Sequence, residues 1–375
     1  MTGAIVVAGA VARRIDCGGH VWALLHWALG FQKLGWSVLF LDRLEPSPGI
    51  RDSFEVRGFL ETMESFGLAE SFSLDIGPDD EPIGLARRVV LEKLGEADLL
   101  LNVMGYLEDP ELLGCARRRV FLDIDPGFGQ MWRALGLCDL FRDHDAFVTV
   151  GTRVGRDDCR VPTCGLPWIP TLPPVVIDRW PSSMERGARF TSVGAWRGPW
   201  APVEYDGERF GLRVHEFRRF AAVPWESGLD FEIALDIDPE DHADASRLVD
   251  GGWRLRDPRS VSGTAQHYQR YVQSSLAEFG IAKEMYVRAR TGWVSDRTAC
   301  YLASGRPAVV QDTGLDGTIE TGVGLVTFST PEEAISASRA VHADWNRHSR
   351  SARALATEHF DSDRVLGRLL DEVAA

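Results

Sequence analysis

The sequence predicts an α/β protein with two domains, each built on a parallel sheet with helices on its faces. The first observation is length, because 375 residues exceed the usual size of one domain. The second is the alternation of short apolar runs with helical patterns, which is typical of βαβ units. The third is a proline-rich connection at residues 161–183, after which the alternation restarts. Two such halves enclose a cleft, where small ligands usually bind.

The first half begins with an apolar strand, a helix and a second strand. In the helix, apolar residues recur at i, i+3, i+4 and i+7 from Val21, which gives it one core-facing side. The strands expected here are residues 4–8, 37–41, 98–103, 119–124 and 146–150. The helices expected are residues 20–34, 52–65 and 83–94. Open α/β sheets bind ligands at the carboxyl ends of their strands, so polar residues there are candidates for function.

The second half repeats this alternation after the proline-rich connection. Its expected strands are residues 190–193, 231–235, 253–255, 308–310 and 324–328. Its expected helices are residues 296–304, 331–340 and 346–373. We therefore divide the chain into a first domain at residues 1–175, a second at 176–355, and a C-terminal helix at 356–375.

Composition excludes several classes of protein. The formal net charge of -14 argues against a general binder of nucleic acid or of anionic membranes. The six cysteines form no CxxC pair and have no histidine at a metal-binding spacing, so we expect free thiols and no metal site. The N-terminus predicts a strand and no signal peptide. No apolar run approaches the ~20 residues of a membrane span, so we expect a cytoplasmic protein.

Residues 278–312 predict an anion site. Thr291, Gly292 and Trp293 supply a turn, and Ser295 is suited to cap the helix that follows. Gly305 fits the left-handed residue that ends this helix. A glycine-containing loop that leads into a helix N-terminus binds anions, because free N–H groups and the helix dipole point at the ligand. The surrounding cations are Lys283, Arg288, Arg290 and Arg297. We infer a phosphorylated ligand.

Common nucleotide and hydrolase motifs are missing. The glycines after the first strand, Gly9, Gly18 and Gly19, do not form G-x-G-x-x-G, so Asp42 has no support as a ribose ligand. The chain contains neither a Walker lysine motif nor a G-x-S-x-G elbow. Dehydrogenases, kinases and hydrolases of these types are therefore disfavoured.

Three segments resemble the GT-B glycosyltransferases. Gly19-His20, followed by LGFQKLGWSV at residues 29–38, is similar to the first βαβ unit of that family. YLASGRPAVV at residues 301–310 is similar to the family's donor-side segment, and VGAWRG at residues 193–198 resembles the loop after the first strand of its donor domain. The resemblance implies two Rossmann-like domains that face each other across a cleft, with a C-terminal helix that crosses back to the first domain.

The resemblance also implies a donor site. A sugar would be transferred from a nucleotide diphosphate sugar without a metal or other cofactor, and basic residues would neutralise the leaving diphosphate. Arg197 and Lys283 would hold the phosphates, while the helix N-terminus at Ser295 would donate N–H groups. Glu278 matches the first glutamate of the retaining members' E-F-G motif and would contact sugar hydroxyls. The second glutamate of that pattern falls near Cys300, which departs from the family, and Asp296 is a possible substitute.

His20 is the alternative catalytic centre. In the inverting members the histidine of the GH pair is the general base that takes the acceptor's proton. Asp123, Asp125 or Asp145 would orient it if their strand ends face the same cleft, and Asp125 is our second catalytic candidate. Both residues also have structural interpretations, since His20 could cap its helix and Asp125 could form an Asx-turn before Pro126.

The donor-site residues have structural interpretations too. Arg197 and Lys283 could be solvated surface charges, and Trp293 could be a core residue instead of one that stacks on a ligand. Both interpretations stay open at the level of sequence.

The sequence therefore predicts a glycosyltransferase that moves a sugar from a nucleotide diphosphate to an acceptor. The acceptor would be a small molecule, such as a natural product, or a lipid-linked compound, and it would lie against the first domain. Two rivals remain, namely a nucleotide-sugar epimerase of the same fold and a non-catalytic two-lobed binding protein. The base of the nucleotide, the sugar, the acceptor, the stereochemical outcome and the oligomeric state stay open.

Overall fold

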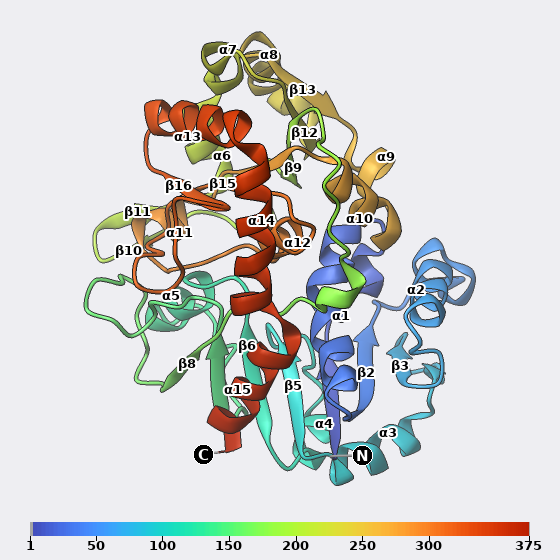
Figure 1. Cartoon of the computed structure of the whole chain (residues 1–375). Helices are drawn as coiled ribbons and strands as arrows, with labels where there is room; N and C mark the ends of the chain where they lie inside the picture. The colour runs from blue at the N-terminus through green and yellow to red at the C-terminus, as the bar shows by residue number, and fades with distance from the viewer. Residues whose placement is uncertain (1–2, 375) are drawn as a thin grey trace.

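Two α/β domains are stacked along the long axis of the molecule (Figure 1). The computed structural model describes residues 3–374. The first domain holds the blue-to-green part of the chain and the second the yellow-to-red part, and the last helices run down beside both. No helix within residues 3–374 combines the length and the apolar character needed to cross a membrane.

The first sheet is parallel except at one edge. Its strand order is β4-β3-β2-β1-β5-β6-β7-β8, with β4 antiparallel to β3. The strands are β1 Ala4–Ala8, β2 Ser37–Arg43, β3 Phe72–Asp75, β4 Ile83–Gly84, β5 Leu99–Val103, β6 Arg119–Asp123, β7 Ala146–Thr149 and β8 Trp168–Pro170. The helices are α1 Gly18–Lys33, α2 Phe54–Ser65, α3 Arg87–Glu96, α4 Pro110–Cys115 and α5 Phe128–Ala134. The central strands are buried, as their continuous apolar runs require.

The second sheet is wholly parallel, in the order β13-β12-β9-β14-β15-β16. Its strands are β9 Phe190–Ala195, β12 Phe231–Asp236, β13 Trp253–Arg256, β14 Ala277–Gly280, β15 Ala308–Gln311 and β16 Leu325–Phe328. A hairpin of β10 Val203–Tyr205 and β11 Glu208–Phe210 lies apart from it. The helices are α6 Arg213–Phe217, α7 Val223–Ser227, α8 His242–Asp250, α9 Pro258–Ser262, α10 Ala265–Ser274, α11 Glu284–Arg288, α12 Asp296–Ala303, α13 Pro331–Ala343, α14 Trp345–Leu355 and α15 Ser362–Ala374.

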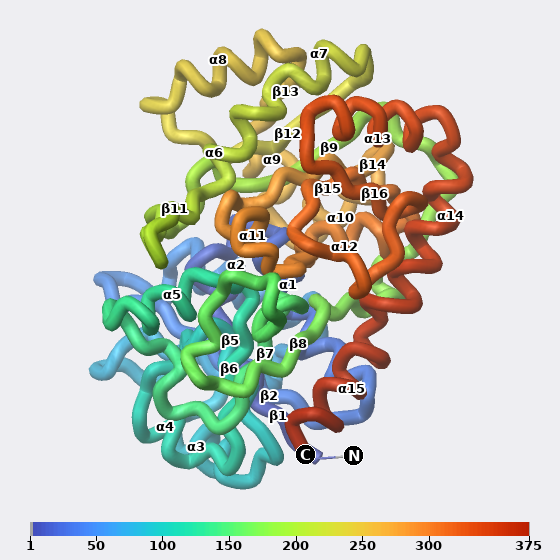
Figure 2. Tube along the Cα trace, turned by 90° about the vertical axis from the view of Figure 1, so that its left-hand side faces the viewer, coloured from blue at the N-terminus to red at the C-terminus, as the bar shows by residue number. Residues whose placement is uncertain are grey.

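The C-terminal helices join the two domains. α14 packs on α12 of the second domain, and α15 packs on α1 of the first, which both views show (Figures 1 and 2). At Gly30 of α1, an added Cβ would lie 2.5 Å from Leu366 Cδ1 of α15, so the glycine permits the close approach. The predicted α/β class with two Rossmann-like domains and a returning C-terminal helix is therefore confirmed. The domain boundaries at residues 175 and 355 stay predictions.

Three sequence-based expectations need correction. The helix expected at 83–94 begins only at Arg87, because Gly84 has a φ of +91° and lies against the backbone of β3. The connection at 161–183 is not entirely a linker, since β8 completes the first sheet. The tail at 346–373 is not one helix. It breaks at Asp361, whose neighbours exchange backbone hydrogen bonds with Val175.

Candidate functional site

A cavity of about 710 Å³ lies between the two domains. The first domain contributes the start of α1 and the loop after β6, and the second contributes the carboxyl ends of β9 and β12 with the starts of α6, α10 and α12. Carboxyl ends of parallel strands carry loops and helix N-termini, so they place polar groups and free N–H donors at one edge. The cavity is where such a fold binds ligands.

Arg213 lines this cavity without a counter-ion among residues 3–374, as do the more exposed Arg13 and Arg14. Its guanidinium lies over Gly194, where an added Cβ would be 2.0 Å from the nearer nitrogen, and it makes no hydrogen bond or ion pair with residues 3–374. Burial, followed by repulsion from Arg297, lowers the pKa of Arg213 to about 10. The side chain therefore stays charged at neutral pH. An anion bound in the cavity would supply the ion pair and hydrogen bonds that the guanidinium lacks.

Lys283 bridges the two domains at the wall of the cavity. Its ammonium lies 2.5 Å from Asp125 Oδ2, and the Lys283 side chain is 13% exposed. Asp125 also accepts from Tyr286 Oη and from Trp200 Nε1, the latter at 3.1 Å. Burial lowers the pKa of Lys283 while the Asp125 charge raises it. The structure thus pairs two residues that the sequence assigned to separate roles.

Glu278 and Arg297 form a buried ion pair beside the cavity. Arg297 Nε donates to Glu278 Oε1 at 2.7 Å, and its Nη1 donates to the carbonyl of Val193 at 2.8 Å. Arg297 lines the cavity, whereas Glu278 lies behind it in β14. Glu278 therefore holds Arg297 in the structure, and its predicted contact with sugar hydroxyls stays a prediction.

The N-terminus of α12 points at the cavity as the sequence predicts. Ser295 caps the helix by accepting from the backbone N–H of Arg297, and Gly305 ends it with a φ of +69°. Ser295, Asp296 and Trp293 line the cavity. Burial raises the pKa of the Asp296 carboxyl. Trp293 packs on Tyr286 with a ring distance of 4.4 Å, so part of its face is already covered.

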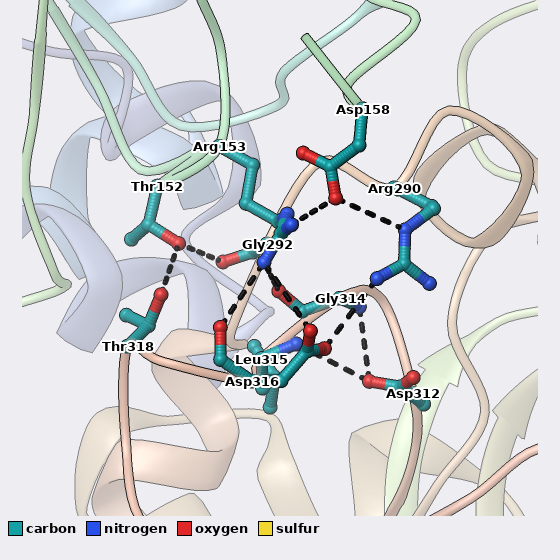
Figure 3. Close-up of polar contacts among 10 residues, drawn as sticks. All are labelled: Thr152, Arg153, Asp158, Arg290, Gly292, Asp312, Gly314, Leu315, Asp316 and Thr318. Atoms are coloured by element: carbon teal, nitrogen blue, oxygen red, sulfur yellow. Dashed lines mark hydrogen bonds and ion pairs between the residues drawn. The ribbon is translucent and has the colours of Figure 1, made fainter. Parts of the chain in front are cut away.

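Thr291 and Gly292 contact the first domain. The Gly292 carbonyl accepts from Thr152 Oγ1 at 2.8 Å, and the Thr291 carbonyl accepts from the backbone N–H of Arg153 at 3.0 Å. Figure 3 shows Arg153 reaching the carbonyls of Gly314 and Asp316, with Arg290 and Asp158 beside it. Neither Thr291 nor Gly292 lines the cavity, so the structure places these two predicted donor residues in the domain contact.

Arg197 lies outside the cavity. Its guanidinium forms a bidentate ion pair with Asp241, and its side chain is 55% exposed. Arg197 follows β9 as expected, but it does not line the cavity. Arg213 lies over Gly194 at the end of the strand instead. The phosphate-binding role predicted for Arg197 gains no support from this placement.

Known structures of the same architecture were found for the whole chain. An alpha-glucosyltransferase in complex with UDP-glucose and DNA containing an abasic site matches with a TM-score of 0.61 at 13% identity, over 99% of each chain. The pneumococcal O-GlcNAc transferase GtfA, in complex with UDP and GlcNAc, matches at 0.60 and 11%, over 100% of this chain and 99% of its own. Anabaena HepE in complex with UDP and glucose matches at 0.57 and 12%, over 99% of each. No protein-family model and no curated protein sequence matches the chain.

The chain has the GT-B fold. The interdomain cavity is therefore the GT-B cleft, and the first and second sheets are its two Rossmann-like halves.

His20 lies at the start of α1 on the wall of the GT-B cleft. Its Nε2–H donates to the carbonyl of Ala10 at 2.8 Å, which leaves Nδ1 as the unprotonated nitrogen. Burial lowers the pKa of His20 to about 4. A carbonyl, and none of the expected carboxylates, orients the ring. Those carboxylates bond other groups: Asp123 to Gln130 and Thr149, Asp125 to Lys283, and Asp145 to Arg119.

Sequence reasoning missed several residues of the GT-B cleft, among them Arg213 and Tyr268. Arg213 follows the β10–β11 hairpin, and only the preceding Gly211-Leu212 hinted at a loop that precedes a helix. Tyr268 lies in α10 at an apolar helical position, where a tyrosine looks like a core residue. No local sequence pattern marks either residue, because the packing of distant segments decides which side chains reach the cleft. Cys300, where the family pattern breaks, is buried near His26 and does not line the cleft.

Proposed function

We propose that the protein is a glycosyltransferase that uses a nucleoside diphosphate sugar as donor and needs no metal. The observation that carries this proposal is Arg213, a half-buried guanidinium without a counter-ion on the wall of the cleft. A nucleoside diphosphate supplies the missing negative charge. The known structures with this fold that are in complex with UDP support the same ligand class.

In the proposed reaction the bond from the anomeric carbon to the diphosphate breaks, and negative charge grows on the departing oxygen. Arg213 and Arg297, together with the free N–H groups of the α12 N-terminus, stabilise that charge. The acceptor hydroxyl forms the new bond and loses its proton. His20 Nδ1 is our candidate to take that proton in an inverting reaction, since its other nitrogen is held by Ala10.

We place the acceptor on the first domain, where a second cavity of about 590 Å³ opens at the carboxyl edge of β1, β2 and β3. Tyr106 of this cavity stacks under Arg13 of the cleft at 4.8 Å, so the two spaces share a wall. The carboxylates that line it are Asp42, Asp75, Asp80, Glu108 and Asp109, and the arginines are Arg43 and Arg87. Burial raises the pKa of Asp42 to about 7, yet the carboxylates still outnumber the cations.

An acidic lining repels a phosphodiester backbone. We therefore propose a neutral or cationic small-molecule acceptor instead of nucleic acid or a phosphate-bearing lipid. The free cysteines of the chain fit the reducing cytoplasm that we also propose.

The test is a thermal-shift panel with UDP, GDP and dTDP. At a ligand concentration a thousandfold above Kd, binding stabilises the fold by about 4 kcal/mol, so one nucleotide should raise Tm clearly. Arg213→Ala should abolish the shift without lowering the Tm of the free protein, because it removes a half-buried charge that has no partner. Arg197→Ala, an arginine outside the cleft, is the matched control and should keep the shift. The proposal fails if no nucleotide shifts Tm, or if the two variants behave alike.

A further inference from the structure

The peptide group between Ala10 and Val11 lies between the ring of His20 and a buried carboxylate. Its C=O accepts from His20 Nε2 at 2.8 Å, and its N–H donates to Asp42 Oδ2 at 2.7 Å. The two hydrogen bonds leave opposite edges of one planar trans peptide, whose C=O and N–H are linked by resonance. Asp42 is therefore joined to the His20 ring through a chain of two hydrogen bonds.

Three backbone N–H groups hold the Asp42 carboxylate at the end of β2. Besides Val11, Ala12 N donates to Oδ2 at 2.9 Å, and Arg43 N donates to Oδ1 at 2.6 Å. The Asp42 side chain is 6% exposed and forms no ion pair within residues 3–374. A buried carboxylate without a cation is costly, so a positive charge at the far end of the Ala10–Val11 peptide would interact favourably with it.

His20 gains such a charge when it acts as the base. Nδ1 takes the proton of the acceptor hydroxyl, and the ring then holds a proton on each nitrogen and one positive charge. Nε2–H becomes a stronger donor to the Ala10 carbonyl, and the N–H of the same peptide becomes a stronger donor to Asp42. Hydrogen bonds in such a chain strengthen one another away from water. The carboxylate thus favours the protonated ring without touching it.

We propose that Asp42 is a positioning residue for His20, which fixes the tautomer of the ring and supports its basicity through the Ala10–Val11 peptide. The inference rests on the proposed function, because it assumes that His20 takes a proton from an acceptor. Asp42 also lines the cavity in which we place the acceptor, so the carboxyl borders both the acceptor and the peptide that holds the base.

A purely structural role of Asp42 would give a different result. Asp42 also holds the turn at residues 12–14, because it accepts from the backbone N–H of Ala12. If that were its whole role, removing the carboxylate would lower the free energy of unfolding and leave the protonation and hydrogen bonding of the His20 ring unchanged. The measurement must therefore report on the ring itself.

The experiment is ¹⁵N NMR of the imidazole rings in the intact free protein at pH 8. The Asp42 carboxyl is ionised there, because burial raises its pKa only to about 7. The signals of His20 are assigned by their loss in His20→Gln. In wild type we expect a proton on Nε2 and none on Nδ1, because Nε2 donates to Ala10.

Two substitutions separate the geometry of the chain from its charge. Asp42→Ala removes the acceptor of both N–H groups, so the His20 ring should show a mixture of the two tautomers. Asp42→Asn keeps an amide oxygen that can accept from Val11 and Ala12. It should keep the wild-type tautomer and move the Nε2–H proton signal upfield, because the peptide loses the charge that polarised it.

Asp123→Asn is the matched control. Asp123 ends β6 of the same sheet, is 2% exposed, and has a pKa that burial raises to about 6. It accepts from Gln130, Thr149 and the backbone N–H of Asp125, none of which bonds to His20. This variant should lose stability as well, yet leave the His20 signals at their wild-type positions.

Two results overturn the inference. One is a set of His20 signals that is the same in wild type, Asp42→Ala and Asp42→Asn. The other is an equal change in Asp42→Asn and in Asp123→Asn. If Asp42→Ala does not fold, Asp42→Asn decides alone, and an unchanged Nε2–H signal overturns the inference.

The thermal-shift panel separates this inference from the proposed function. Asp42→Asn should keep the nucleotide-induced Tm shift of wild type, because Asp42 does not line the cleft. No Tm shift with any nucleotide in the wild type refutes the proposed function, and it leaves the coupling of Asp42 to His20 to be judged by the NMR spectra.

Discussion

The cations that line the cleft within residues 3–374 are Arg13, Arg14, Arg213, Arg259, Lys283 and Arg297. Lys283, Arg297 and Arg213 differ in their partners, and these partners decide what each can bind. Lys283 is neutralised by Asp125 and Arg297 by Glu278, both at short distance. Arg213 alone of these has no carboxylate partner. Removing one member of a buried ion pair leaves the other charge uncompensated and destabilises the fold. Removing an unpaired cation leaves no such charge behind. In variants of Lys283 and Arg297, a loss of stability cannot be separated from a loss of ligand binding. A variant of Arg213 reports on ligand binding alone.

His20 allows a prediction about pH. Its folded pKa of about 4 lies below the ordinary value of 6.5, so folding favours the neutral ring. The stability that this supplies is complete above pH 6.5 and is lost as the pH falls toward 4, because the unfolded chain binds the proton first. Relative to His20→Gln, which keeps a side-chain N–H for Ala10, wild type should lose up to about 3 kcal/mol of unfolding free energy over this range.

Urea unfolding of both proteins at pH 7 and pH 4.5 measures the difference. Other titrating groups are the same in the two proteins and cancel. A free-energy difference that stays constant between these pH values would show that the His20 ring is not kept neutral by burial.

At the scale of elements, α15 decides how the second half of the chain is attached to the first. It packs on α1 through Leu366 and Ser362, whose atoms would lie 2.5 and 2.9 Å from a Cβ at Gly30. The core of the first domain continues through these contacts into α12 and α14. Because α1 begins at the cleft with His20 and α12 begins there with Asp296, the helix packing behind the cleft sets the distance between its two walls.

Gly30→Ala should lower the unfolding free energy by about 1–3 kcal/mol, since the added methyl group forces two packed helices apart. Gly367→Ala is the matched control, because Gly367 lies in α15 with nothing within 4 Å of an added Cβ. That variant should be neutral or gain up to about 1 kcal/mol from higher helix propensity. Urea midpoints compare them, and equal losses would mean that the two helices do not pack closely at Gly30.

At the scale of the molecule, the two domains contact each other on both sides of the cleft. On one side Trp22 Nε1 of α1 donates to the carbonyl of Ala265 at 2.9 Å. On the other side the loop after β7 meets Gly292 and Gly314, and glycine permits the approach in both cases (Figure 3). Lys283 and Asp125 bridge the space between. These three contacts hold the two domains together, so the width of the cleft depends on them.

Gly292→Ala tests the second contact. The residue has a φ of +67°, and an added Cβ would lie 2.3 Å from Thr152 Oγ1 and 2.8 Å from Arg153 Cγ. Gly317 has a φ of +75° with nothing within 4 Å, so Gly317→Ala carries the same backbone strain of roughly 1–2 kcal/mol without the collision.

Gly292→Ala should lower Tm further than Gly317→Ala and increase the radius of gyration in solution scattering, because the domains must separate at that point. The same scattering profile for both variants would contradict a role of Gly292 in holding the domains together.

Local patterns in the sequence determined much of this protein. Ser295 precedes the first residue of α12 and Gly305 follows its end, as predicted. These signals can be recognised in the sequence because a side-chain cap and a left-handed glycine affect only neighbouring residues. The strands were predictable because buried parallel strands are continuous apolar runs. Their alternation with helices led to the two-domain α/β fold, and the short motifs led to the GT-B resemblance.

Only the tertiary structure decided which polar residues share the cleft. Arg197 and Arg213 both lie near loops after β9, yet the first pairs with Asp241 at the surface and the second lies over Gly194 in the cleft. Lys283 and Asp125 are 158 positions apart and meet across the domains. Charges find partners through space at no fixed spacing in sequence. The sequence could therefore predict the helix that begins at the cleft, while packing decided which cations line the cleft.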